Sequence, residues 1–213
     1  MTPNSKSKVF KWAETRKQQV QPNTPSWKIL SDATIHNVTR FVLLLKRSIP
    51  ANKMNPLFNG ASRAKFAYSN DSSLFELGCY VYFRIDLWHV ENKFDESREK
   101  VLKPCLDEFI KVFEDVLGFC YGNDILQSRF NFYGKLNREK HGELIDFFLA
   151  QLMIQTRNNV LPEVHAYDEY PIAKTEDYTE AFFLKIGLED FRKVILPAIL
   201  QNVKNIYESK QSS

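Results

Sequence analysis

Apolar positions recur at helical spacing along most of the chain. In the first clear case an apolar side chain returns every three or four residues, which places the set on one face of a helix. The members of this set are Ile35, Val38, Phe41, Val42 and Leu45. The pattern predicts a helix over Ser31–Ser48, and Pro50 ends it because proline does not continue a helix.

The segment Ser73–Lys93 is apolar on nearly every side, with few polar interruptions between Leu77 and Val90. A helix of this kind is normally surrounded by other elements. Its start is marked by a capping box, in which Ser73 is followed three residues later by Glu76. We therefore expect Ser73–Lys93 to be the buried central helix of the fold.

Further amphipathic helices follow, and we find no convincing strand-like alternation of apolar and polar residues outside the helical patterns. Their predicted bounds are Glu96–Leu117, Asp124–Leu136, Asn137–Arg157 and a final stretch from Thr175 to Glu208, interrupted near Gly187 and Pro197. Pro104 lies inside the first of them and either kinks it or marks its true start. The sequence predicts an all-α protein, a single compact bundle of six or seven helices around Ser73–Lys93.

The length of 213 residues lies between one large domain and two small ones. Residues 1–25 are basic and polar and are predicted to be an N-terminal arm, and residues 26–213 are predicted to form a single all-α domain. The second of two long connections, 158–175, carries acidic residues around one histidine: Glu163, His165, Asp168 and Glu169. It lacks the glycine turn of a calcium loop, so we interpret it as a solvated acidic loop and expect neither a metal nor a cofactor.

Cysteine content and hydropathy indicate the cellular compartment of the protein. Three cysteines without a Cys-x-x-Cys pair indicate buried thiols in a reducing compartment. The first 20 residues lack the apolar core of a secretory signal. The longest apolar stretch, Leu74–Val90, contains charged residues, each of which would cost about 2.5–3.5 kcal/mol in the middle of a bilayer. We expect a cytoplasmic protein without a membrane span.

Charge is divided unevenly along the chain. Residues 1–70 contain 12 Lys and Arg but only two acids, whereas residues 71–213 contain 17 Lys and Arg and 24 acids. Five of the basic residues fall at the end of the first predicted helix or in the connection after it: Lys46, Arg47, Lys53, Arg63 and Lys65. They are candidates for binding an anionic partner, because a phosphate-facing surface needs many cations and few anions. The alternative is that these cations neutralise acidic segments of the same fold.

The central helix also holds the best polar cluster. At 100° per residue, one face carries Cys79, Tyr82, Asp86 and His89. Asp86 and His89 are three residues apart, so their side chains can meet. A carboxylate that holds an imidazole is the arrangement of a general base or of an oriented metal ligand. The alternative is that the two side chains satisfy each other in a crowded interior.

Arg84 is followed, after four intervening residues, by His89. This spacing resembles the Arg-(four to six residues)-His motif of the HEPN family of compact helical nucleases. Ile85 stands where that family often has a polar residue. The resemblance implies a ribonuclease activity that uses Arg84 and His89.

Signatures of nucleophiles, phosphate loops and dinucleotide sites are absent from the sequence. The sequence therefore favours a soluble helical binding or adaptor protein without catalytic activity, which contacts an anionic partner through its basic first third. Its partner is a second protein, a further copy of the chain or, with weaker support, a nucleic acid. The alternative function is a small helical enzyme, HEPN-like or other, that uses Asp86 and His89.

Overall fold

The computed structural model describes residues 24–48, 71–93, 98–118, 121–138, 145–155, 185 and 188–211. Their regular structure is entirely helical, which confirms the all-α class for this part of the chain. The elements are α2 (Ser26–Ser48), α4 (Asp71–Glu91), η1 (Arg98–Leu102), α6 (Lys103–Leu117), α7 (Gly122–Arg138), α8 (Ile145–Gln155), η4 (Phe191–Ile195) and α10 (Leu196–Gln211). The symbol η denotes a short π-helical stretch.

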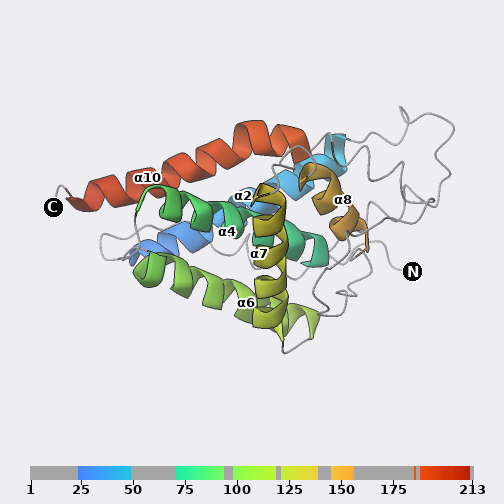
Figure 1. The fold of residues 1–213 in the computed structure, drawn as a ribbon, viewed down its shortest axis with the longest axis horizontal. Coiled ribbons are helices and arrows are strands. Elements are labelled where there is room, and N and C mark those ends of the chain that lie inside the picture. The colour runs from blue at the N-terminus through green and yellow to red at the C-terminus, as the bar shows by residue number, and fades with distance from the viewer. Residues whose placement is uncertain are drawn as a thin grey trace, which may run out of the picture.

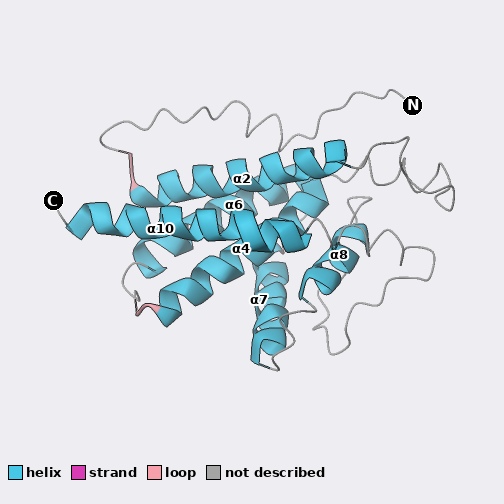
Figure 2. Cartoon of the chain, turned by 90° about the horizontal axis from the view of Figure 1, so that it is seen from above, coloured by secondary structure: helices cyan, strands magenta, loops and turns pink. Residues whose placement is uncertain are grey.

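Helix α4 packs against each of the other five α-helices of the described structure. Helices α2, α6 and α10 run lengthwise along the molecule, and α7 crosses them (Figures 1 and 2). Helix α2 is also in contact with both α6 and α10. Among the described α-helices, α4 is thus the one that contacts all of the others.

Burial of α4 follows from its composition. All ten residues from Leu74 to Phe83 are buried, and so is Ile85. Trp88, in the last turns, packs against the core with part of its ring exposed. Because each fully buried large apolar side chain contributes about 1.5–3 kcal/mol, α4 supplies a large share of the stability of the fold.

Phe109 of α6 is the aromatic centre of the contact between α4 and α6. Its ring lies 5.4 Å from that of Phe75, 5.1 Å from that of Tyr82 and 4.8 Å from that of Phe113, measured between centroids. Offset and tilted rings at these separations attract one another beyond the burial of their surface. Gly78 completes the contact, because its missing side chain leaves room for the Phe109 ring.

The structure corrects two predicted helix starts. Helix α2 begins at Ser26, five residues earlier than expected, where the carbonyl of Pro25 accepts hydrogen bonds from the N–H groups of Lys28 and Ile29. Helix α4 begins at Asp71, so Ser73 lies inside the helix and the predicted capping box is wrong. The carboxylate of Glu76 is instead in the core.

Prolines explain the two π-helical stretches. Pro104 lies in the first turn of α6, just after η1, and Leu102 before it is in the helical conformation with φ of −69° and ψ of −44°, so the helix already runs through this point and does not start at the proline. Pro197 holds the same place in α10, directly after η4, and the N–H of Leu196 donates to the carbonyl of Phe191, five residues back. A proline lacks an N–H and its ring crowds the carbonyl four residues earlier, so a wider turn before it relieves the clash.

The end of α6 and the start of α7 are joined through Glu114. Gly118 ends α6 in the left-handed conformation with φ of 75°, and its N–H donates to the Glu114 carbonyl at 2.9 Å. The Glu114 carboxylate accepts a hydrogen bond of 2.9 Å from the N–H of Gly122, the first residue of α7. The side chain of Glu114 therefore links the end of α6 to the start of α7.

Candidate functional site

Asp86 and His89 lie in the last turns of α4 and are hydrogen-bonded to different groups. The carboxylate of Asp86 accepts two hydrogen bonds from the guanidinium of Arg98, and the one from Nη2 is 3.0 Å long. Nδ1 of His89 lies 2.7 Å from the carbonyl oxygen of Ile85, one turn earlier. Asp86 therefore connects the end of α4 to η1, and the imidazole is held by the backbone of its own helix.

His89 has no exposed surface, and its ring lies edge-on to that of Trp88 at 5.5 Å. Burial lowers the pKa of the imidazole, and the charge of Arg98 lowers it further. The Ile85 carbonyl and the charge of Asp86 act in the opposite direction but do not outweigh burial. The imidazole is therefore neutral at pH 7, and it reaches a substrate only if the surrounding helices move.

Arg84 lies one helical turn after Tyr80 and is half-buried. Its Nε is buried and has no hydrogen-bond partner in the structure that is described. The guanidinium lies close enough to act on the hydroxyl of Tyr80, whose pKa it lowers against the effect of burial. Of the three catalytic candidates, Arg84 thus belongs to the surroundings of Tyr80, while Asp86 is bonded to Arg98.

The five candidates for binding an anionic partner fall largely outside the described residues. Lys46 and Arg47 lie in the last turn of α2, where the backbone but not the side chains is described. The other three lie outside the described ranges: Lys53, Arg63 and Lys65. The acidic loop with Glu163 and His165 lies outside them as well.

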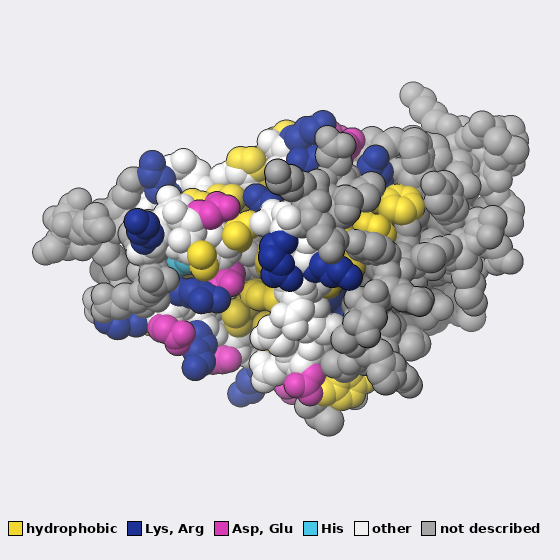
Figure 3. Space-filling model, viewed as in Figure 1, with side chains coloured by type: hydrophobic (Ala, Val, Ile, Leu, Met, Phe, Trp, Pro, Cys, Tyr) yellow, Lys and Arg dark blue, Asp and Glu magenta, His cyan; other side chains and the backbone are white. Residues whose placement is uncertain are grey.

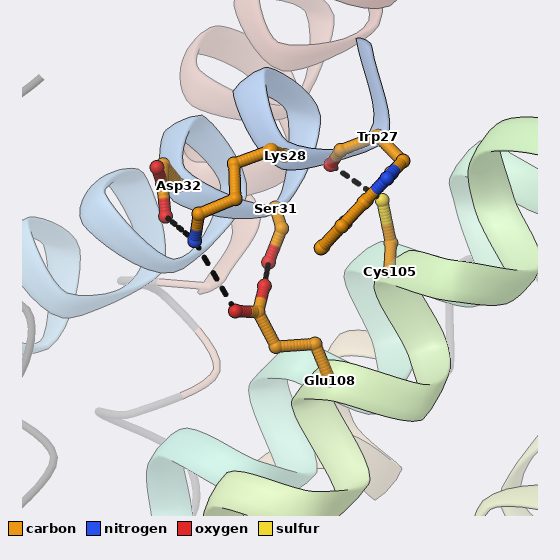
Figure 4. A network of polar contacts seen from close by, with 6 residues as sticks. All are labelled: Trp27, Lys28, Ser31, Asp32, Cys105 and Glu108. Carbon is orange, nitrogen blue, oxygen red and sulfur yellow. Dashed lines mark hydrogen bonds and ion pairs between the residues drawn. The ribbon is translucent and has the colours of Figure 1, made fainter. Parts of the chain in front are cut away.

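Lys28 is the one Lys or Arg of residues 1–70 whose side chain is described. Its ammonium lies 3.5 Å from Asp32 and 3.3 Å from Glu108 of α6 (Figure 4). Glu108 also accepts a hydrogen bond of 2.6 Å from the hydroxyl of Ser31. This network fixes α2 against α6, and for this one cation the intramolecular alternative is what the structure contains.

A cysteine lies next to the same network. The Cys105 thiol donates to the carbonyl of Trp27 at 2.9 Å (Figure 4). Burial raises the pKa of this thiol, and the nearby carboxylate of Glu108 raises it further. Cys105 is therefore protonated and unreactive at neutral pH, as expected for a buried thiol.

A buried ion pair joins α4 to α7. Nε of Arg129 donates to one carboxylate oxygen of Glu76 at 2.7 Å, and Nη2 donates to the other at 2.6 Å. The Arg129 side chain is 1% exposed and that of Glu76 is 0% exposed. Each charge loses its hydration on folding. Two hydrogen bonds between the same pair of side chains help to offset this desolvation free energy.

Sequence reasoning missed this pair, although the sequence contains a signal for it. The buried residues of α7 fall on one stripe, and Arg129 occupies a position in it: Ile125, Leu126, Arg129, Phe132, Tyr133 and Leu136. Glu76 in turn stands inside an apolar run of α4. A single charged residue in an apolar stripe indicates a buried partner of opposite charge.

The second polar cluster of the interior surrounds Tyr80. Asp146 of α8 accepts a hydrogen bond of 2.9 Å from Nε of Arg192 of η4, and its other carboxylate oxygen is buried without a partner. The hydroxyl of Tyr80 is likewise buried, and the guanidinium of Arg84 lies within hydrogen-bonding reach of it. Burial raises the pKa of Tyr80 to about 12, with the charges of Arg84, Asp146 and Arg192 acting on it.

Buried polar atoms that lack a hydrogen bond destabilise the folded state. Each buried group without a hydrogen bond costs about 1–3 kcal/mol. Two such atoms belong to residues whose charges act on Tyr80, namely Nε of Arg84 and Oδ1 of Asp146. We call these three residues together with Arg192 the Tyr80 cluster. A concentration of unsatisfied groups of this kind calls for a physical explanation.

The described residues lack a metal-binding group and a membrane-spanning helix. They contain no group of three or more His, Cys, Asp or Glu side chains placed to hold a metal ion. None of their helices has both the length and the apolar character that crossing a bilayer requires.

Comparison of the chain with protein-family models, with curated proteins and with solved structures found no match.

Proposed function

We propose that the protein is a helical binding module that contacts an anionic partner through its basic first third. The observation that carries this proposal is the distribution of charge, with 12 Lys and Arg against two acids in residues 1–70. A density of cations this high, with so few anions beside it, suits a surface that faces phosphates. The five residues that carry the contact are Lys46, Arg47, Lys53, Arg63 and Lys65.

The described ion pairs support the proposal. Glu76, Asp86 and Asp146 are paired with arginines that also lie beyond residue 70. These acids are therefore already neutralised without the cations of the first third. Asp107, which lies on α6, is exposed, and no ion pair joins it to another described residue. Lys28, the one cation of the first third whose side chain is described, is paired with Glu108 of the later part.

Single-stranded nucleic acid is the ligand with which to test the proposal. Phe66 directly follows Lys65, and Tyr68 stands two residues further on. Aromatic side chains beside cations are typical of surfaces on which unpaired bases stack. Their presence favours a single strand over a duplex.

The experiment is a titration of a labelled single-stranded oligonucleotide with the full chain at several salt concentrations. We expect the affinity to fall steeply with salt, because each phosphate contact releases counterions. The double variant Arg63→Ala, Lys65→Ala should reduce the slope of log affinity against log salt by about 0.7 per lost contact.

The matched control is the double variant Lys103→Ala, Lys111→Ala. It removes the same charge from two exposed positions of α6 and should leave the slope unchanged. Absence of binding at low salt would refute the proposal. An equal effect of both double variants would also refute it, because binding would then depend on net charge rather than on this surface.

A further inference from the structure

Helix α6 carries a row of exposed charges that alternate in sign. Its members are Lys103, Asp107, Lys111 and Asp115, each of which stands four residues after the one before it. Residues four apart on a helix lie one above the other on the same face. We call these residues the α6 stripe. At a rise of 1.5 Å per residue, the stripe extends over about 18 Å of the helix.

The α6 stripe lies on the outside of the molecule. In Figure 1, α6 forms the lower edge of the described helices. In Figure 3, drawn from the same side, side chains of both signs lie close together along the lower left edge, over α6. All members of the stripe are exposed, so another molecule is able to reach them.

The side chains of the stripe do not pair within the fold. None of them forms an ion pair or a side-chain hydrogen bond with another residue of the described structure. The other two acids of α6 do so. Glu108 accepts a hydrogen bond from Ser31, and Glu114 accepts one from the N–H of Gly122. The stripe is thus the part of the charge of α6 that remains available to a partner.

Pairing along the helix does not account for the stripe. Exposed amides four residues apart are bonded to each other on two other helices, Gln127 to Asn131 at 3.0 Å on α7 and Gln201 to Asn205 at 2.9 Å on α10. No such bond joins the charges of the stripe where the structure describes them. In two of the three neighbouring pairs the cation also precedes the acid, which is the less favourable order within a helix.

The helix dipole does not account for the stripe either. Lys103 is the first residue of α6, and Asp115 lies in its last turn. The N-terminus is the positive end of the dipole, so a cation there and an acid at the other end both oppose it. An antiparallel neighbouring helix reverses this relationship, because it places the opposite end of its own dipole beside each of these charges.

The order of signs fits a second copy of the same stripe that runs in the opposite direction. In an antiparallel pair with a two-fold axis at the level of position 109, Lys103 of one chain faces Asp115 of the other. Asp107 faces Lys111 in the same way, and the symmetry repeats each contact. A parallel pair in register would instead place like charges opposite each other, so the pattern selects one direction.

We propose that the α6 stripe pairs with the α6 stripe of a second copy of the chain to form a two-fold symmetric dimer. Exposed ion pairs are individually weak and are screened by salt, so the dimer is a weak one that dissociates as salt is added. This surface goes beyond the function proposed above, since none of its residues lies in the basic first third. The variant that lacks Lys103 and Lys111 would also weaken the dimer, but the salt slope of oligonucleotide binding still counts the phosphate contacts of each bound chain.

The experiment is sedimentation velocity of the full chain over a range of protein concentrations, at low and at high salt. We expect reversible dimerisation at low salt. The dissociation constant should rise at least about tenfold at high salt, because screening weakens every ion pair of the interface.

Charge reversal at the centre of the stripe tests the direction of the pairing. Asp107→Lys places a cation opposite Lys111 of the second chain, and Lys111→Asp places an acid opposite its Asp107. Each variant should be monomeric by itself and should keep the melting temperature of the wild type, since both positions are exposed. An equimolar mixture of the two variants should dimerise again, because two cations of one chain then face two acids of the other.

Lys193→Asp is the matched control for Lys111→Asp. It makes the same change of charge at an exposed position of η4 and should leave dimerisation unchanged. A wild-type protein that stays monomeric at low salt would overturn the proposal. Persistence of the dimer in either single variant, or a mixture of the two that stays monomeric, would overturn it as well.

Discussion

Phe109 lies against the bare backbone of Gly78, so close that a Cβ atom on Gly78 would be 2.5 Å from Cε2 of the ring. The ring has little freedom to move away, because Phe75, Tyr82 and Phe113 enclose it. The absence of a side chain at position 78 thus sets how closely α4 and α6 approach each other.

Replacement of Gly78 by Ala should therefore destabilise the protein by about 1–3 kcal/mol, as expected for overpacking of a core. Urea unfolding measures the loss. Gly134→Ala is the control, since the added Cβ would meet only Nη1 of Arg138 at 3.5 Å, an ordinary contact. That variant should gain about 0.5–1 kcal/mol from reduced backbone freedom in the unfolded chain. A neutral Gly78→Ala would contradict the tight contact.

Removal of either partner of the Glu76–Arg129 ion pair should cost about 3–5 kcal/mol, because the remaining charge would be buried without compensation. Glu76→Met and Arg129→Met are the single variants. The double variant, with Met at both positions, should recover most of the loss, since a well-packed apolar pair avoids desolvation of both charges. Urea unfolding of the four proteins forms a double-mutant cycle, and additive losses would argue against direct coupling of the two side chains.

Protonation of His89 should destabilise the protein below neutral pH. Burial lowers the pKa of this imidazole in the folded state, so the unfolded chain binds the proton first as the pH falls. The stability is therefore complete above the ordinary pKa of about 6.5 and is lost as the pH falls from there to the lower pKa of the folded protein.

Urea unfolding from about pH 7.5 to about pH 5.5 measures this loss. His89→Gln should show a smaller decrease across the same range. The other histidines and all carboxyl groups are the same in both proteins, so the difference isolates His89. An identical decrease in the two proteins would exclude His89 as its source.

In the contact between α2 and α6, Ser31 should matter more than Lys28. Ser31→Ala removes a hydrogen bond of 2.6 Å to the Glu108 carboxylate and should cost about 1.5–3 kcal/mol. Lys28→Ala removes an ammonium that is 29% exposed and should cost about 0–1 kcal/mol. Thermal unfolding of both variants gives the comparison, and a larger effect at Lys28 would invert the assignment.

Periodicity of apolar residues was sufficient to predict the all-α class, because a helix that buries one face requires apolar residues every three or four positions. Helix α4 was also recognisable, since a segment apolar on all sides has to be covered. The start of α2 was not recognisable from the sequence, because contacts with α6 stabilise the first turns of this helix. Trp27 and Ser31 are hydrogen-bonded to Cys105 and Glu108, respectively.

The polar interior was less predictable than the helices. Asp86 and His89 were correctly placed three residues apart on one helix, but Arg98 of η1 supplies the partner of Asp86. Spacing within one helix shows which side chains are able to meet, and not which residue of another element competes for them. The Tyr80 cluster depends on three elements, so its composition emerges only once α4, α8 and η4 are packed together.

The buried pair of Glu76 and Arg129 also determines how α7 is aligned on α4. A shift of α7 by one helical turn would move Arg129 by about 5.4 Å. Both hydrogen bonds would then be lost, and two uncompensated charges would cost several kcal/mol each. Apolar contacts are less directional than this two-point ion pair, so they discriminate less sharply between neighbouring alignments. The pair therefore adds a directional requirement to the alignment that apolar and aromatic contacts between the two helices already favour.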